Sequence, residues 1–241
     1  MQIAGIQKCS MVDWPGKIVA ALFTPGCNFN CSYCHNRMLL GDEDAVRTLD
    51  SAEVAAWLER RAGLLDGVVV SGGEATLQPD LAGFIETVRA MGYPVKLDTN
   101  GSRPGVLRAL TGVGLVDYVA MDVKAPDHLY DEVTGTKTDQ AAIGESIRVL
   151  LEGETDYEFR TTVLPYFKHN DVRAIGERIK GAQRYVLQQY QPPANRNQLQ
   201  IEGTLHSAEW FQEAVENVKP LVVDCETRGV SELTFSHAAV A

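Results

Sequence analysis

Hydrophobic residues in this chain fall into short continuous runs, separated by stretches in which they recur at helical spacing. The continuous runs are short and rich in β-branched residues, as expected for parallel strands that are buried on both faces. They cover residues 17–24, 67–71, 94–98, 117–123, 157–164 and 184–190, with 221–224 as a further short candidate.

The stretches between these runs carry apolar residues every three or four positions, which predicts amphipathic helices. One apolar face consists of Leu81, Phe84, Ile85, Val88 and Met91, with Pro79 expected at the first helical position. Four further faces consist of Val54, Trp57, Leu58 and Leu65; of Ile143, Ile147, Leu150 and Leu151; of Val172, Ile175 and Ile179; and of Trp210, Phe211, Val215 and Val218. Asp50 is the predicted N-cap of the first of these, with Glu53 three residues on. We interpret every apolar face as core packing.

Alternating strands and helices predict an α/β fold with a parallel sheet. Six or seven such units suit a partial (β/α)6-type TIM barrel, because a closed eight-unit barrel needs roughly 250 residues. We expect one domain over 1–241, with its core at about 17–193, an N-terminal extension at 1–16 and a C-terminal helix and strand within 205–241. In such folds the chemistry gathers at the carboxyl ends of the strands.

Composition narrows the class of protein. The 241 residues are 45% hydrophobic and 22% charged, which is typical of a globular protein, and the formal net charge of −10 argues against broad binding to nucleic acids or anionic membranes. No apolar stretch is long enough to span a bilayer, and the start MQIAGIQKCS lacks the features of a signal peptide. We therefore expect a cytoplasmic protein, in which clustered cysteines bind metal or take part in catalysis.

Three cysteines, Cys27, Cys31 and Cys34, follow the first strand with the spacing C-x3-C-x2-C. A redox dithiol would use only the last two of them. A structural zinc site would need a fourth ligand, for which the candidates are His35, Cys9 and Cys225. An iron–sulfur cluster held by three thiolates would keep one iron open to another ligand. The spacing favours the cluster.

Small and charged residues stand where the predicted strands end. The second strand ends in Gly72-Gly73-Glu74, and paired glycines allow either a close backbone approach to a ligand or a tight turn. The third and fourth strands end in polar residues, which are Asp98, Thr99, Asn100, Asp122 and Lys124.

Arg160 interrupts the apolar run of the fifth strand. A charge in a buried strand is costly unless it is paired. Pairing with a cofactor would explain Arg160, and so would an internal ion pair with Asp122. We favour a cofactor role for Lys124 and Arg160.

The cysteine motif, with the aromatic Tyr33 before its last cysteine, resembles that of the radical S-adenosylmethionine (SAM) superfamily. The resemblance implies a [4Fe-4S] cluster on Cys27, Cys31 and Cys34, whose open iron chelates SAM. An electron from the reduced cluster then cleaves SAM to methionine and a 5′-deoxyadenosyl radical. The GGE element resembles the motif that contacts the methionyl amino group in this family, although Ala75 stands where many members have proline.

The motifs LDTNG, MDVK and FRTTVLP, the lead-in VDWPGK, the segment FTPGC and the element YCHN resemble one branch, the glycyl-radical-enzyme activases. The branch associates the elements around Asp98, Thr99, Met121 and Asp122 with the SAM carboxylate, sometimes beside a monovalent cation. Lys124 and Arg160 are expected to act in catalysis with the three cysteines. The cofactor-binding residues implied are Tyr33, His35, Gly72, Gly73, Glu74, Asp98, Thr99, Asn100, Asp122, Lys124, Arg160 and, at the sixth strand exit, Gln191.

The implied activity is abstraction of a Cα hydrogen from one glycine of a partner enzyme. The opening IQKCSMVDWPGK is most similar to that of activating proteins for anaerobic ribonucleoside-triphosphate reductase, so this reductase is the expected partner, with a flavodoxin- or ferredoxin-type electron donor. Neither nucleic acid nor membrane is expected as a partner. The alternatives are a pyruvate formate-lyase activating enzyme, a small-molecule enzyme similar to 7-carboxy-7-deazaguanine synthase, and a non-catalytic metal-binding scaffold.

Overall fold

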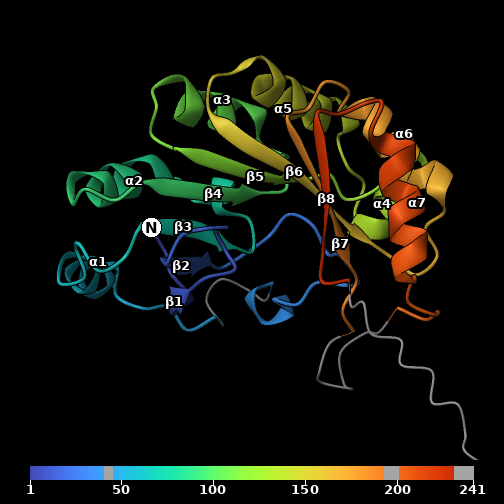
Figure 1. Cartoon of the computed structure of the whole chain (residues 1–241). Coiled ribbons are helices and arrows are strands. Elements are labelled where there is room, and N and C mark those ends of the chain that lie inside the picture. Colours follow the sequence, from blue (N-terminus) through green and yellow to red (C-terminus); the bar gives the residue numbers. More distant parts are fainter. Residues whose placement is uncertain (41–45, 193–200, 231–241) are drawn as a thin grey trace, which may run out of the picture.

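The computed structural model describes residues 1–40, 46–192 and 201–230, and they build one eight-stranded sheet in the order β1 to β8 (Figure 1). Strand β1 is antiparallel to β2, and every later pair is parallel. Over the described residues β1 and β8 remain the two edges, so the sheet is open, in agreement with the predicted partial barrel. The strands are β1 (Gly5–Ser10), β2 (Val19–Thr24), β3 (Gly67–Gly72), β4 (Val95–Thr99), β5 (Tyr118–Asp122), β6 (Asp156–Val163), β7 (Arg184–Gln189) and β8 (Asp224–Arg228).

Helices lie along the outer side of the curved sheet (Figure 1). They are α1 (Ser51–Glu59), α2 (Leu81–Ala90), α3 (Pro104–Gly112), α4 (Tyr130–Thr134), α5 (Gln140–Glu152), α6 (His169–Arg178) and α7 (Ala208–Val218), with short 3-10 turns at Arg37–Leu39, Ala75–Leu77 and Asp127–Leu129. The apolar faces predicted from the sequence supply buried core residues, such as Leu81 and Ile85 on α2 and Ile143 on α5. The Asp50 carboxylate caps α1 as predicted, accepting a hydrogen bond from the amide of Ala52.

Several element boundaries differ from the prediction. Helix α2 begins at Leu81 after Asp80, so Pro79 precedes the helix instead of opening it, and Leu65 lies beyond the end of α1. Strand β1 and helices α3 and α4 had no predicted counterpart. The last strand occupies Asp224–Arg228 rather than 221–224, because pairing with β7 defines it and its polar residues form no apolar run.

The predicted C-terminal segment is described up to residue 230, and the prediction for 231–241 lies outside the described residues. Within the described part of the chain, no helix combines the length and the apolar character that crossing a bilayer requires.

Candidate functional site

A cavity of about 240 Å³ opens where the carboxyl ends of β2 to β6 meet. It collects side chains from five separate parts of the sequence, as the strand-end rule predicted. Of the predicted site residues, the structure brings together Cys27, Cys31, Tyr33, Cys34, His35, Gly72, Gly73, Glu74, Asp98, Thr99, Asn100, Asp122, Lys124 and Arg160.

The loop that carries the three cysteines is fixed by hydrogen bonds. Arg37 donates to the carbonyl of Cys31 at 3.0 Å and to Oδ1 of Asn30 at 2.9 Å. The amide of Asn30 in turn donates to the carbonyl of Thr134, at the end of α4. Cys31 itself is buried, and the amide of Cys34 donates to its carbonyl at 3.1 Å. The loop therefore presents its three sulfur atoms to the cavity from a braced backbone.

The surroundings of the thiols bear on what they could hold. Burial raises the pKa of Cys27 to about 11 and also raises the pKa of Cys31. Stable thiolates at these positions need a compensating cation, and iron–sulfur clusters take thiolate ligands readily. Cys9 and Cys225 do not line this cavity. In the described ranges, no three His, Cys, Asp or Glu side chains are placed to hold a single metal ion.

Glu74 links the loops after β3 and β4. Its buried carboxylate accepts hydrogen bonds from the amide and hydroxyl of Thr76, from the Thr99 hydroxyl at 2.7 Å and from the Asn100 amide at 2.7 Å. Burial raises the pKa of Glu74, while these hydrogen bonds act in the opposite sense. The side chain thus fixes two walls of the cavity relative to one another.

The paired glycines are required by the chain itself. A Cβ atom on Gly73 would lie 1.9 Å from the carbonyl oxygen of Gly26, and one on Gly72 would lie 2.1 Å from the amide nitrogen of Thr24. Gly72 also has a φ of 125°, which side chains disfavour. The amide of Gly73 donates to the carbonyl of Thr24, the last residue of β2, and the amide of Glu74 donates to the carbonyl of Gly26, both at 2.8 Å. The close approach therefore occurs between two loops of the protein, and a contact with a ligand stays a prediction.

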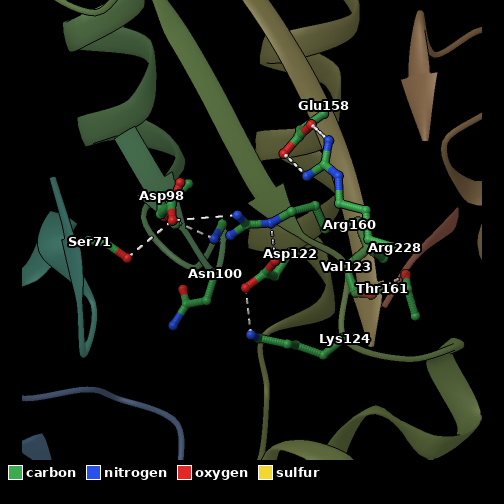
Figure 2. A network of polar contacts seen from close by, with 12 residues as sticks. Ser71, Asp98, Asn100, Asp122, Val123, Lys124, Glu158, Arg160, Thr161 and Arg228 are labelled. Atoms are coloured by element: carbon green, nitrogen blue, oxygen red, sulfur yellow. Dashed lines mark hydrogen bonds and ion pairs between the residues drawn. The ribbon is translucent and has the colours of Figure 1, made fainter. Parts of the chain in front are cut away.

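Four charged residues form one wall of the cavity (Figure 2). Nε of Arg160 lies 2.8 Å from Oδ1 of Asp122, and Nζ of Lys124 lies 2.8 Å from Oδ2 of the same carboxylate. Arg160 also approaches Oδ2 of Asp98 at 3.4 Å, and the Ser71 hydroxyl donates to that oxygen at 3.1 Å. The internal ion pair considered for Arg160 is thus present, and its role toward a cofactor stays a prediction.

Opposite charges keep these acids ionised. Burial alone would raise the pKa of Asp122, but the charges of Arg160 and Lys124 hold it well below its usual range. The pKa of Asp98 is lowered against the same effect of burial, by Arg160 and Lys96. Asp122 likewise raises the pKa of Lys124, although burial acts against this. The wall therefore offers fixed charges of both signs.

Two buried oxygen atoms of residues that line the cavity have no hydrogen-bond partner among the described residues, and one of them, Oδ1 of Asp98, is in ion-pair contact with Lys96. The hydroxyl of Tyr33 is fully enclosed and unpaired, and Nζ of Lys124 lies 5.8 Å from the centre of its ring. Because buried hydroxyls are nearly always hydrogen-bonded, an acceptor on a bound ligand fits this position. The sulfur donors, the fixed charges and this unpaired hydroxyl together suit the cluster and SAM.

Comparison with protein families decides the class. A model described as the radical SAM superfamily matches residues 21–179, which include the cysteine loop and every charged strand end of the cavity. This chain belongs to the radical SAM superfamily. Radical SAM enzymes use a [4Fe-4S] cluster and SAM, and these are the cofactors of this enzyme.

Curated relatives of this radical SAM enzyme include proteins of two activities. A Methanocaldococcus jannaschii protein, named provisionally as a glycyl-radical enzyme activating enzyme, is 34% identical over 198 residues, or 79% of this chain and 80% of its own. A pyruvate formate-lyase-activating enzyme from Clostridium pasteurianum is 32% identical over 56% of this chain and 57% of its own. A 7-carboxy-7-deazaguanine synthase from Methanothermobacter thermautotrophicus is 27% identical over 64% of each chain.

Among solved structures, Streptococcus suis SuiB in complex with its precursor peptide SuiA matches this radical SAM enzyme with a TM-score of 0.66. The match covers 88% of this chain and 48% of SuiB at 12% identity, so the two proteins share the fold.

Some residues of this radical SAM enzyme lie elsewhere than the sequence indicated, or were missed. Gln191 lies outside the cavity, where it is exposed and donates to the carbonyl of Gly229 at 3.2 Å, so its cofactor role stays a prediction. Two buried charges that support the charged wall were missed. Glu158 receives two hydrogen bonds from Arg228 at 2.7 and 2.9 Å (Figure 2). Lys96 forms an ion pair with Asp98 at 2.9 Å. Their signal was a charge within an apolar strand, two positions before a predicted site residue.

Proposed function

We propose that this radical SAM enzyme activates a glycyl-radical enzyme by removing a hydrogen atom from one of its glycines. The observation that carries the proposal is the 34% identity, over 79% of the chain, with the Methanocaldococcus jannaschii protein named as such an activating enzyme. The pyruvate formate-lyase-activating enzyme from Clostridium pasteurianum supports the same class. The proposed partner is anaerobic ribonucleoside-triphosphate reductase, because of the IQKCSMVDWPGK opening.

In this proposal Cys27, Cys31 and Cys34 hold the cluster. When bound, the cluster and SAM supply a carbon radical that takes a hydrogen atom, so no side chain has to act as a general acid or base. Lys124 and Arg160 provide positive charge for the SAM carboxylate, and the hydroxyl of Tyr33 donates a hydrogen bond to SAM. A monovalent cation beside Asp98 and Asp122 would share these carboxylates with Arg160 and Lys124.

Access for a partner also supports the proposal. The sheet of the described residues is open between β1 and β8, and the cavity lies at the carboxyl ends of the strands between them. An open sheet leaves room for a loop of another protein, which a closed barrel would exclude. The electron donor in this proposal is a flavodoxin- or ferredoxin-type protein.

A second candidate is favoured by one observation, the 27% identity with a 7-carboxy-7-deazaguanine synthase over 64% of the chain. In that case the same cavity would act on a small heterocyclic substrate. Unlike the activase, such an enzyme would have no protein substrate, although it would still need an electron donor.

The test is anaerobic reconstitution of the whole chain with iron and sulfide, followed by addition of dithionite and SAM. We expect 5′-deoxyadenosine and methionine, and a glycyl radical doublet in the paramagnetic resonance spectrum when anaerobic ribonucleoside-triphosphate reductase is added. Pyruvate formate-lyase is the parallel partner. SAM cleavage without a glycyl signal on either partner would favour the small-molecule enzyme, and no cleavage at all would contradict both candidates.

A further inference from the structure

The VDWPGK lead-in lies far from the cavity, at the amino ends of the strands, and the proposed function does not use it. We call residues 12–17 the floor turn. The ring of Trp14 is 5% exposed and packs against Val19, Ala21 and Val69 on the inner side of β2 and β3. A Cβ atom on Gly67, the first residue of β3, would lie 3.0 Å from this ring. Trp14 therefore fills the end of the sheet opposite the cavity.

Hydrogen bonds fix the backbone of the floor turn. The Ser10 hydroxyl accepts from the amides of Val12 and Asp13 at 3.3 and 3.2 Å, and the Lys17 amide donates to the carbonyl of Trp14 at 3.0 Å. Nζ of Lys17 lies 4.3 Å from the centre of the Trp14 ring. This geometry directs the carbonyl of Asp13 toward the inside of the sheet, where it accepts a hydrogen bond from Lys96 at 2.5 Å.

Lys96 connects the floor turn to the cavity. Its side chain is 1% exposed, and its ammonium lies 2.5 Å from the Asp13 carbonyl oxygen and 2.9 Å from Oδ1 of Asp98. The two residues are two positions apart on β4, so both side chains point to the same face of the sheet. An ammonium buried to this degree needs such partners, because an unpaired charge in the interior is very costly.

The two oxygen atoms of the Asp98 carboxylate have different partners. Oδ1 faces Lys96 at ion-pair distance, without the direction of a hydrogen bond. Oδ2 faces the cavity side, where the Ser71 hydroxyl donates to it and Arg160 approaches at 3.4 Å. A change at Lys96 would free Asp98 to rotate and would unbalance the charge that holds Arg160.

We propose that Lys96 is a positioning residue of the SAM site, anchored by the Asp13 carbonyl of the floor turn and acting on the ligand through Asp98 and Arg160. The inference rests on the proposed location of SAM in this cavity. It gives the lead-in motif a role, because the turn places the carbonyl that fixes Lys96. Lys96 itself does not line the cavity, so it would act on the ligand only through other residues.

The experiment measures the dissociation constant of SAM by equilibrium dialysis on anaerobically reconstituted whole protein, for the parent, Lys96→Met, Asp98→Asn and the double variant. Iron content and melting temperature are recorded for each. We expect Lys96→Met to weaken SAM binding about tenfold at unchanged iron content, as is typical of residues coupled in one network. The double variant should bind no more weakly than Asp98→Asn alone, because Lys96 acts through Asp98.

Two further variants keep the test decisive. Lys96→Arg retains a cation and should bind SAM more tightly than Lys96→Met. Lys219→Met changes a lysine at the end of α7 that is 56% exposed and lies outside the cavity, and it should leave the SAM affinity unchanged. If Lys96→Met does not fold, the double variant can still be used, because it removes the buried charges of both Lys96 and Asp98. Its SAM affinity is then compared with that of Asp98→Asn alone.

The outcomes separate the two proposals. A parent protein that holds its iron but binds no SAM would contradict the proposed site itself. SAM binding by the parent that is unchanged in Lys96→Met, or losses that simply add in the double variant, would overturn the role of Lys96 alone.

Discussion

Arg160 and Asp122 are register partners on the neighbouring strands β6 and β5, and Nε of Arg160 lies 2.8 Å from Oδ1 of Asp122. The other oxygen of this carboxylate pairs with Lys124, so both cations of the cavity wall share one acid. A ligand carboxylate that enters the cavity would meet two cations whose positions are already fixed. Such preorganisation lowers the entropy lost on binding.

Replacement of Arg160 tests this arrangement. We expect Arg160→Met to lower the free energy of unfolding by about 1–3 kcal/mol, less than for a buried pair left without any counter-charge, because Asp122 keeps Lys124 and Asp98 keeps Lys96. SAM affinity should fall as well. Urea unfolding gives the first quantity and equilibrium dialysis the second.

Arg108→Met is the matched control for this change. Arg108 pairs with Glu145 at 2.7 Å, but its side chain is 60% exposed, so its loss should change stability by no more than about 0.5 kcal/mol. Equal effects of the two substitutions would show that the wall contributes no more than a surface ion pair.

The ionised Asp122 carboxylate should make the free energy of unfolding depend on pH. Because Arg160 and Lys124 depress the pKa of Asp122 in the folded protein, its contribution is fully present above the unfolded value of about 4 and is lost as pH falls below it. The stability difference between the parent and Asp122→Asn should therefore shrink below about pH 4. Denaturant titrations from pH 7 to pH 3 measure it.

The stability of the parent must be compared with that of the variant at each pH, because the pKa of another buried acid is shifted in the opposite direction. Burial raises the pKa of Glu74, so its contribution is present at low pH and lost as pH rises through its folded-state value. A difference that grows toward low pH would contradict the charge assignment for Asp122.

Two glycine-to-alanine substitutions should have opposite effects. Gly73→Ala places a methyl group against the carbonyl of Gly26, so we expect a loss of at least about 2 kcal/mol in unfolding free energy and reduced iron loading, because the cysteine loop must move. Gly83→Ala lies in α2 with open space around it and should add about 0.5–1 kcal/mol. Normal iron content in Gly73→Ala would show that the two loops are not coupled.

Cys31→Ala should abolish iron loading and SAM cleavage while leaving helix content largely intact, because the loop is also held by Arg37 and Thr134. Cys225→Ala, in β8 and outside the cavity, should retain full iron content. Iron analysis and circular dichroism measure both. Collapse of the whole fold in Cys31→Ala would instead favour a structural metal at this position.

The sequence predicted the six strands from β2 to β7, because strands buried on both faces leave continuous apolar runs. Strand β8 was placed several residues too early, since Glu226 and Arg228 pair with Arg184 and Glu158 on β7 and β6 and the strand has no apolar pattern. Helix α4 escaped prediction because five residues are too few to display a helical period.

The sequence predicted those cavity residues in which a charged or metal-binding side chain stands in or just after the end of a predicted strand, such as Cys27, Asp122 and Arg160. Lys96 and Glu158 were missed because a single charge inside an apolar run gives no indication of its partner, which only the strand register supplies. The linkage of Glu74 to Thr99 and Asn100 likewise depends on how two loops meet.

The alternation of faces along β4 and β6 constrains how this enzyme can change. On β4 the side chains of Val95 and Leu97 pack into the hydrophobic core. Those of Lys96 and Asp98 point to the opposite face and form an ion pair. Substitutions that aim at thermal stability without altering the site are therefore restricted to every second position of β4, and there to apolar side chains of similar volume. A variant library that randomises the intervening positions, such as Lys96 and Asp98, would change the charged wall of the site and with it the activity, even if it was designed only for stability.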